Sequence, residues 1–483
     1  MKKINWADNR NFSLLADFYE FTMSNGYLNC NIDDTISYFD LYFRNVPDKG
    51  GFVIASGLEQ FVEYIENLKF SEEDINYFRS QNIFSENFLN FLKNFKFTCD
   101  VWAIPEGTPV FPDEPLLIIK GPIIQAQFLE TAALIIFNHQ SLIATKSNRI
   151  VRAANDIPIF EFGARRAQGA DASVLGARAA YIGGVIGTSN TLSSKMYNIT
   201  PVGTMAHSWV LMFDSEIEAF EAYANTFPEN CLLLVDTYDT LKKGVPNAIK
   251  TFDKILKPKG IRPKGIRLDS GDVAWLSKEA RKLLDNAGYE DAKIIVSNSL
   301  DEYIITDLLL QGAKIDGFGV GEKLITSFTS PYLGGVYKLC AIEKEDKLIP
   351  KIKISENVEK ITTPGFKKVI RFYNKDTNKA EADLICLNDE NFDNVDEIEI
   401  FHPVHTWKRK VITNFYKKEL LVQVYSKGNL IYKLPSLDSI VKYSKEEIDN
   451  LWDEVKRLDH AHIYIVDLSQ KLWNLKQELL QKR

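Results

Sequence analysis

The stretch GIRLDSGDVAWLSKEARKLLDNAGYEDAKIIVS, residues 265–297, decides the fold of this chain. It opens and closes on short apolar runs of β-compatible residues, at 265–269 and 292–297. Between them lies a predicted helix whose apolar face is made by Leu276, Ala280, Leu283, Leu284 and Ala287. Gly288 then supplies a helix stop. A strand, a helix and a second strand in this order predict two parallel strands joined by a crossover helix.

The same alternation extends over residues 136–345. Further apolar runs are PIFEF (158–162), PVGTMA (201–206), CLLLVD (231–236) and IDGFGV (315–320), and helix-period stretches separate them. We expect each run to form a strand. Repeated βα units form a parallel sheet, either open or closed into a barrel.

Two further regions flank this α/β domain. Residues 1–135 mix aromatic-rich helices, at 58–68 and 86–95, with short strands, which predicts an α+β domain. Residues 346–483 are charged at first, then resume short strands before an amphipathic terminal helix. We interpret this last region as a smaller accessory module. Three domains agree with a length of 483 residues, which is more than one hydrophobic core usually serves.

Composition excludes several classes of protein. The net charge of −7, from 58 Lys plus Arg against 65 Asp plus Glu, argues against a general nucleic-acid binder. No apolar run approaches membrane-spanning length, and the first residues lack the apolar stretch of a signal peptide. The five cysteines are scattered and contain no C-x-x-C pair, so we expect no disulfide framework and a reducing, cytoplasmic location.

Polar and glycine residues gather where the apolar runs of the middle region end. They occur at 163–166, 207–208, 236–239, 267–272, 297–299 and 317–321. The carboxyl ends of barrel strands face one rim, where active sites are built. Packing alone does not explain this concentration, so we expect a binding or catalytic site at that rim.

Individual members of this set are less specific. His207, in GTMAHSWV, is one of six histidines, and a lone histidine is more often a core residue bonded to a carbonyl than a catalytic group. GGVIGTSN (183–190) and GFGVGEK (317–323) are glycine-rich turns that could cradle phosphate, although a tight turn is the commoner role of each. Arg267 and Asp269 share a strand face, as anion and sugar ligands or as a structural ion pair.

No dedicated metal site is predicted. His402-x-x-His405 and His460-x-His462 lack a third ligand nearby, so they are expected to be solvated or core histidines.

Taken in order, these motifs resemble nicotinate phosphoribosyltransferase. The resemblance is carried by LLADFYEFTM (14–23), FEFGARRAQGADA (160–172), GTMAHSWV, LLVDTYDT (233–240), GIRLDSGD and GFGVGEKLIT (317–326), with further segments over about three quarters of the chain. It implies an irregular βα barrel of the type II phosphoribosyltransferase kind, in a homodimer with shared active sites. It also implies NAD salvage, in which phosphoribosyl passes from 5-phosphoribosyl-1-diphosphate to nicotinate with ATP as co-substrate and Mg²⁺ on the phosphates.

The resemblance also assigns roles to residues. Tyr19 of the neighbouring subunit and Phe162 would stack on the two faces of the pyridine ring. Arg267 would bind the nicotinate carboxylate, with Thr204 beside it. The remaining roles are diphosphate or ribose for Arg165, ribose for Asp269, and 5-phosphate for Gly319, Gly321 and Thr326.

The same resemblance makes His207 the residue that ATP phosphorylates, oriented by Asp236. A phosphohistidine would then favour the form of the enzyme that binds substrate tightly. The chain departs from the family pattern at Glu322, where a threonine is expected after Gly-Val-Gly. A carboxylate there repels phosphate unless Lys323 or a metal offsets it.

Three alternatives stay open at this stage. The same fold could act on nicotinamide or on quinolinate, because acid and amide differ by a few contacts. A catalytically silent paralogue could sense the same ligands. A metal-dependent barrel lyase is disfavoured, since the convergent His and carboxylate ligands that it needs are missing.

Overall fold

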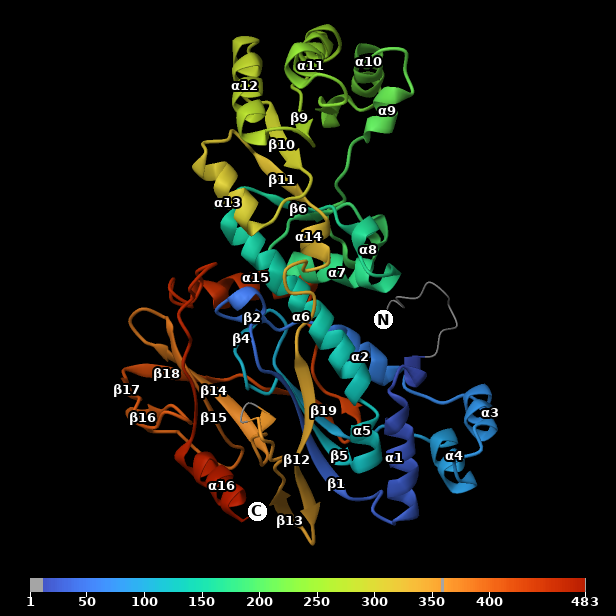
Figure 1. Ribbon diagram of the computed structural model, residues 1–483, viewed down its shortest axis with the longest axis vertical. Coiled ribbons are helices and arrows are strands. Elements are labelled where there is room, and N and C mark those ends of the chain that lie inside the picture. Colours follow the sequence, from blue (N-terminus) through green and yellow to red (C-terminus); the bar gives the residue numbers. More distant parts are fainter. Residues whose placement is uncertain (1–11, 358–359, 483) are drawn as a thin grey trace. The chain divides into compact units, whose positions relative to one another are not determined.

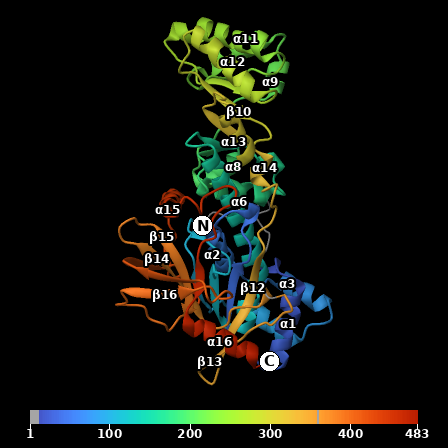
Figure 2. The ribbon, with the colours of Figure 1, turned by 60° about the vertical axis from the view of Figure 1, so that its left-hand side comes forward.

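The computed structural model describes residues 12–357 and 360–482, and these form two compact units. One unit comprises residues 143–331. The other combines the described residues up to Leu142 with those from Tyr332 onward. Each unit is described separately below (Figures 1 and 2).

The unit of residues 143–331 is built on six parallel strands. Their order in the sheet is β7, β6, β11, β10, β9, β8. Their bounds are β6 (Ile159–Glu161), β7 (Gly187–Thr188), β8 (Leu232–Leu234), β9 (Gly265–Leu268), β10 (Lys293–Ser297) and β11 (Gly317–Val320). Consecutive strands are neighbours except for β7 and β8, which lie at the two edges of the sheet, and the last strand, β11, pairs with the first, β6. That order is the order of a barrel with one open seam beside β8.

Helices follow the strands of this unit, and three of them, α8, α9 and α10, lie in succession between β7 and β8 (Figure 1). They are α7 (Ala170–Ile182), α8 (Thr191–Tyr197), α9 (His207–Leu211), α10 (Glu216–Thr226), α11 (Val245–Thr251), α12 (Val273–Asn286), α13 (Glu302–Leu310) and α14 (Glu322–Ile325). In α12 the predicted apolar face is the buried one, with Leu276, Ala280 and Leu284 inside. Gly288 has φ +80° directly after the helix, which confirms the predicted helix stop.

The prediction of a strand at 201–206 is wrong. Only Pro201 makes a bridge, to Thr188, and the chain then leaves the sheet. Two backbone hydrogen bonds join this segment to Thr188, whose N–H donates to the carbonyl of Thr200 and whose carbonyl accepts from the Val202 N–H. Gly203 then has φ +147°, a conformation that few other residues adopt, and it turns the chain away from the sheet. The seam of the barrel therefore lies between β7 and β8, where the apolar run 201–206 fails to become a strand.

The other unit contains an antiparallel sheet of seven strands in the order β13, β12, β1, β5, β3, β19, β20. These are β1 (Ile36–Phe43), β3 (Asp100–Ala103), β5 (Leu117–Pro122), β12 (Gly335–Lys344), β13 (Lys347–Pro350), β19 (Val422–Ser426) and β20 (Asn429–Leu430). The helices of the first 153 residues are α1 (Phe18–Asn29), α2 (Leu58–Glu66), α3 (Glu72–Ser80), α4 (Glu86–Lys93), α5 (Ile123–Gln127) and α6 (Glu130–Ala153), whose residues from 143 on belong to the barrel unit.

A second sheet in this unit is formed by the C-terminal segment (Figure 2). It orders β18 (Phe415–Glu419), β14 (Lys367–Asn374), β15 (Ala380–Leu387) and β21 (Val466–Leu468). Two-stranded pairs add β16 (Glu397–Phe401) with β17 (Arg409–Thr413), and β2 (Val53–Ile54) with β4 (Pro109–Val110). The helices are α15 (Leu437–Asp449) and α16 (Gln470–Gln481), and Leu472 of α16 is part of the main hydrophobic core.

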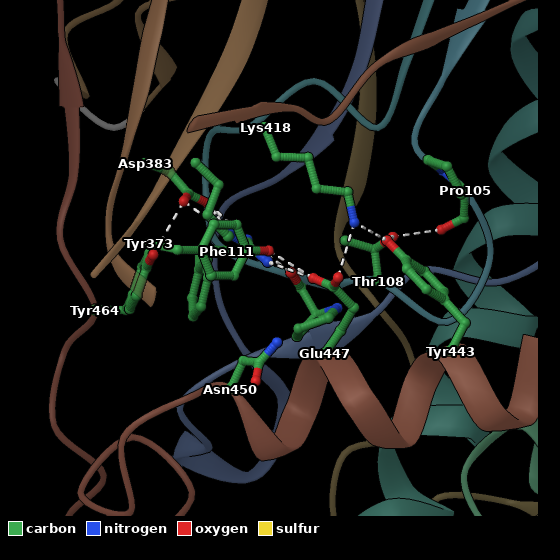
Figure 3. A network of polar contacts seen from close by, with 12 residues as sticks. Pro105, Thr108, Phe111, Tyr373, Asp383, Lys418, Tyr443, Glu447, Asn450 and Tyr464 are labelled. Atoms are coloured by element: carbon green, nitrogen blue, oxygen red, sulfur yellow. Dashed lines mark hydrogen bonds and ion pairs between the residues drawn. The ribbon is translucent and has the colours of Figure 1, made fainter. Parts of the chain in front are cut away.

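A buried polar network joins the loop around β4 to the C-terminal segment (Figure 3). Arg371 on β14 forks onto Asp383 on β15, with N–O distances between 2.6 and 3.1 Å, and donates to the carbonyl of Pro109 at 2.8 Å. Both side chains of this ion pair are 0% exposed. Glu447 on α15 accepts from Tyr373 and Lys418, at 2.6 and 2.8 Å. Buried charges need such pairing, because an unpaired one is strongly destabilising.

Candidate active site at the barrel rim

Asp236, directly after β8, holds the centre of the site. Its Oδ1 lies 3.2 Å from His207 Nε2, and its Oδ2 accepts from the Asp269 N–H at 2.8 Å and the Ser270 hydroxyl at 2.6 Å. A backbone N–H, a hydroxyl and an imidazole nitrogen thus converge on one carboxylate, whose oxygens act as acceptors. His207 Nε2 therefore carries a proton, and Nδ1 is the ring nitrogen with a free lone pair.

The two partners differ in exposure. The Asp236 side chain is 1% exposed and that of His207 is 39% exposed. A buried carboxylate behind a solvent-facing imidazole orients the ring. His207 is the first residue of α9, and Ala206 before it has extended backbone. The imidazole is therefore partly exposed at the beginning of a short helix. A core histidine, by contrast, would be enclosed by other side chains.

Arg267 fixes the loop that leads to this histidine. From β9 its guanidinium donates to the carbonyl of Met205 at 2.7 Å. Its Nε and the hydroxyl of Thr204 are both buried, and neither has a hydrogen-bond partner among the described residues. Burial lowers the pKa of Arg267, while the carboxylates of Asp269 and Asp236 raise it. A guanidinium and a hydroxyl with unused hydrogen-bonding capacity suit a carboxylate ligand.

Asp269 lies in a second hydrogen-bonded group at the ends of β9 and β10. Its Oδ1 accepts from the Ser297 hydroxyl, and its backbone carbonyl accepts from Asn298 Nδ2 at 2.9 Å. Asn298 and Ser299 both have positive φ and are exposed. Carboxylate, amide and hydroxyl groups are thus displayed together at the rim.

The ring of Phe162 lies against the backbone of Gly319. Phe162 follows β6 and donates its N–H to the carbonyl of Val320 at 2.8 Å. A Cβ added to Gly319 would lie 2.3 Å from the Phe162 ring. Glycine at 319 is therefore required for the position of this aromatic ring, in addition to any role in binding phosphate.

Gly321 is the N-cap of the short helix α14, and Thr326 is its C-cap. The Thr326 hydroxyl donates to the carbonyl of Glu322 at 2.7 Å. Lys323 donates to Asp301, the N-cap of α13, at 2.7 Å, so its charge is directed to that carboxylate and not to Glu322. Arg165 is exposed in the turn after Phe162 and lies near enough to Arg267 to contribute to its lowered pKa, although burial is the main cause.

The structure brings all but one of the predicted residues into the barrel unit. Tyr19 lies in the other unit, on α1, and is 44% exposed. Burial, and then the neighbouring carboxylate of Glu130, raise the pKa of Tyr19 above its ordinary value.

The sequence reasoning assigned no role to Ser270, Ser297 or Glu161. The first two stand in the polar runs that end β9 and β10, so their place at the rim was visible but their partners were not. Glu161 could have been noticed as one carboxylate inside the apolar run PIFEF.

No metal centre is evident in the described part of the chain. It contains no group of three or more His, Cys, Asp and Glu side chains placed to hold an ion. None of its helices combines the length and apolar character needed to cross a membrane.

Comparison with known proteins identifies the family. Models of the nicotinate phosphoribosyltransferase N-terminal domain, family and C-terminal domain match residues 14–138, 157–383 and 366–476. A nicotinate phosphoribosyltransferase of Bacillus subtilis is 44% identical over 472 residues, which cover 97% of this chain and 95% of that protein. One of Mycobacterium tuberculosis is 38% identical over 95% of this chain and 92% of its own length.

The chain belongs to the nicotinate phosphoribosyltransferase family. The solved structure of human nicotinic acid phosphoribosyltransferase superposes with a TM-score of 0.86 and 28% identity, covering 96% of this chain and all of that one. A nicotinate-nucleotide pyrophosphorylase of Pyrococcus furiosus shares the fold, with a TM-score of 0.70 at 23% identity. The predicted family and its type II phosphoribosyltransferase fold are confirmed.

Proposed function

We propose that the barrel rim transfers phosphoribosyl from 5-phosphoribosyl-1-diphosphate to nicotinate, forming nicotinate mononucleotide and diphosphate in NAD salvage. Family membership over the full chain supports this reaction. The loop of residues 204–207 is the observation that supports placing this reaction at the barrel rim. Its Thr204 hydroxyl is buried beside the Arg267 contact at Met205, and two residues later it presents His207 to Asp236. A carboxylate-binding group and a reactive imidazole therefore share one short loop.

The glycosyl step needs positioning more than acid–base chemistry. The lone pair of the pyridine nitrogen forms the new bond to ribose C1, while the C1–oxygen bond breaks and its electron pair leaves with the diphosphate. Phe162 would stack on the ring, Arg267 and Thr204 would hold the carboxylate, and Asp269 would accept from ribose hydroxyls. Arg165 would neutralise charge on the diphosphate or ribose side, and Gly319, Gly321 and Thr326 would surround the 5-phosphate.

Mg²⁺ suits this site as a partner of the substrate phosphates. The ion would be held mainly by phosphate oxygens and water, as Mg²⁺ usually is at sites that bind substrate phosphates. When bound, the ion supplies charge neutralisation to the leaving diphosphate.

His207 is the proposed acceptor of phosphate from ATP. Since Nε2 faces Asp236, Nδ1 would attack the γ-phosphorus, and ADP would leave with the electrons of the broken P–O bond. Water would later cleave the phosphoramidate. We further propose a homodimer in which Tyr19 of the partner subunit covers the second face of the pyridine ring.

The decisive experiment measures nicotinate mononucleotide synthesis with and without ATP, in wild type and in His207→Ala. ATP is expected to lower the apparent KM for nicotinate in wild type only, and ³²P from the γ-position should label wild type only. His405→Ala, a change at a histidine of the β16–β17 connection, is the matched control and should behave as wild type. Equal stimulation by ATP in wild type and His207→Ala would remove His207 from the coupling.

The choice of pyridine is tested in the same assay. Nicotinate, nicotinamide and quinolinate are offered separately at one enzyme concentration, and nicotinate should give the largest kcat/KM because Arg267 suits a single carboxylate. A preference for nicotinamide or quinolinate would replace the proposed substrate. Tight ligand binding with no product from any of the three would indicate a sensor in place of an enzyme.

A further inference from the structure

Strand β6 ends on a buried carboxylate that the proposed reaction does not use. Glu161 is 0% exposed, and none of the ion pairs found among the described residues includes it. Burial raises the pKa of Glu161, while hydrogen bonds from Thr188 and Gly163 lower it. A carboxyl group without a countercharge is costly to bury, so its presence in an apolar strand calls for a specific role.

In both side-chain hydrogen bonds of Glu161 the carboxylate is the acceptor. The Gly163 N–H donates to Oε1. The Thr188 hydroxyl oxygen accepts from the Asn190 N–H at 3.0 Å, so its own proton is available for Glu161 Oε2, 2.6 Å away. Both carboxylate oxygens are therefore acceptors. An amide side chain at 161 could satisfy one of these donors but would turn its NH₂ group toward the other.

These contacts connect the turns that follow two neighbouring strands. Gly163 begins the turn that carries Arg165 and directly follows Phe162. Asn190 caps α8 by accepting from Leu192 and Ser193, both at 3.1 Å. The Ser189 N–H adds a bond to the backbone carbonyl of Glu161 at 2.9 Å.

The fit around the carboxylate is close. A Cβ on Gly163 would lie 2.8 Å from Glu161 Oε1 and 2.6 Å from Ile325 Cβ, so only glycine lets the turn fold over the carboxylate. Glu161 is thus enclosed beneath the turn that presents Phe162, with both oxygens engaged. It has no free oxygen with which to reach a substrate.

We propose that Glu161 is a positioning residue, whose carboxylate ties the turn after β6 to the turn after β7 and thereby fixes Phe162 and Arg165 for substrate binding. The inference rests on the proposed function for the identity of the bound ring. The set of contacts from Gly163 and Thr188 to the Glu161 carboxylate, called the clamp below, is a property of the ligand-free protein.

The test uses Glu161→Gln, which turns an NH₂ group toward one of the two donors, and Thr188→Val, which removes the hydroxyl that donates to Glu161. Thr251→Val is the matched control, because Thr251 is equally buried and its hydroxyl bonds only to the carbonyl of Asn247 in its own helical segment. Loss of a charge-assisted hydrogen bond should raise the KM for nicotinate about tenfold in both clamp variants. kcat should stay close to wild type, because Glu161 touches no reacting atom.

A second measurement needs no substrate. Amide hydrogen exchange in peptides covering residues 160–168 and 187–192 should become faster in both clamp variants and stay unchanged in Thr251→Val. The double variant Glu161→Gln, Thr188→Val should lose less than the sum of the two single changes, because both act on the contacts of one carboxylate.

The outcomes separate this inference from the proposed function. Clamp variants that match Thr251→Val in KM and in exchange overturn the inference, as does a fall in kcat with unchanged KM. A wild-type protein that makes no nicotinate mononucleotide overturns the proposed function. The exchange result would still decide whether the clamp exists.

Discussion

Arg267 shows how one residue can have two functions in this site. Its guanidinium holds the loop through Met205 while its buried Nε remains without a partner among the described residues. Arg267→Lys keeps the positive charge but loses the planar fork, so one of these functions must fail. We expect the KM for nicotinate to rise at least about tenfold, as for the loss of a bidentate contact of roughly 1.5–3 kcal/mol.

The measurement is steady-state kinetics with nicotinate varied at saturating 5-phosphoribosyl-1-diphosphate. Arg262→Lys is the control, because Arg262 pairs with Asp291 on the exposed side of the same unit. It should leave both kinetic constants unchanged. If Arg267→Lys were equally silent, the carboxylate would have to bind elsewhere.

At the scale of single elements, strand β11 is tightly packed and also provides the surface against which the ring of Phe162 lies. All four residues of the strand are buried, and two are glycines on the same face. Gly319→Ala would force its Cβ against Phe162, whereas Gly317→Ala would press on Ile295 and Phe160 instead. Each variant should lose about 1–3 kcal/mol of stability through overpacking.

Only Gly319→Ala should also weaken nicotinate binding, because only that change displaces Phe162. Thermal unfolding and the KM for nicotinate, measured on both variants, test this pair. The two variants would contradict the prediction if they lost stability and nicotinate affinity to the same extent.

The barrel strands illustrate what local sequence determines. The runs that became β6, β8, β9, β10 and β11 are mostly apolar, as is usual for strands covered on both sides. The helix predicted between the runs 265–269 and 292–297 was also found, and it begins at Val273 because Asp272 accepts from the Trp275 N–H at 3.0 Å. Periodicity finds such elements, and caps set their ends.

Long-range contacts are what local sequence does not determine. The run 201–206 has strand composition, but its conformation follows from Gly203 and from Arg267, 62 positions from Met205. In the site, His207, Asp236 and Arg267 could be nominated from where they stand at strand ends. The Glu161–Thr188 contact depends on the register of β6 and β7, which no single run of sequence contains.

On the scale of the whole molecule, the non-barrel unit depends on burying charges from distant parts of the chain. Residues near 110, 370–385 and 418–464 meet in the network around Arg371 and Asp383 (Figure 3). Tyr464 donates to Asp383 at 3.0 Å and stacks on Phe111 with ring centroids 3.9 Å apart. The family's N-terminal and C-terminal domain models therefore cover parts of one folded unit.

Glu114 gives this unit a predictable dependence on pH. Burial, and then the adjacent carboxylate of Asp383, raise the pKa of Glu114 well above its ordinary value. The folded protein thus keeps a proton that the unfolded chain releases above about pH 4.3. The stabilisation from this proton is complete below the unfolded pKa, and it declines by about 1.4 kcal/mol per pH unit until the folded pKa is reached.

Glu114→Gln should remove that decline. The glutamine oxygen can still accept from the Phe111 N–H, as Glu114 Oε2 does at 2.8 Å, and its NH₂ group can donate to Asp383 in place of the acid proton. We therefore expect similar unfolding free energies for wild type and variant at pH 5, and a more stable variant at pH 8. Denaturant unfolding at both pH values measures this difference. Glu399→Gln, at an exposed pair with Arg409, should follow wild type at both. Parallel pH profiles for wild type and Glu114→Gln would mean that Glu114 is ionised in the folded protein, and the network would then have to hold one more negative charge.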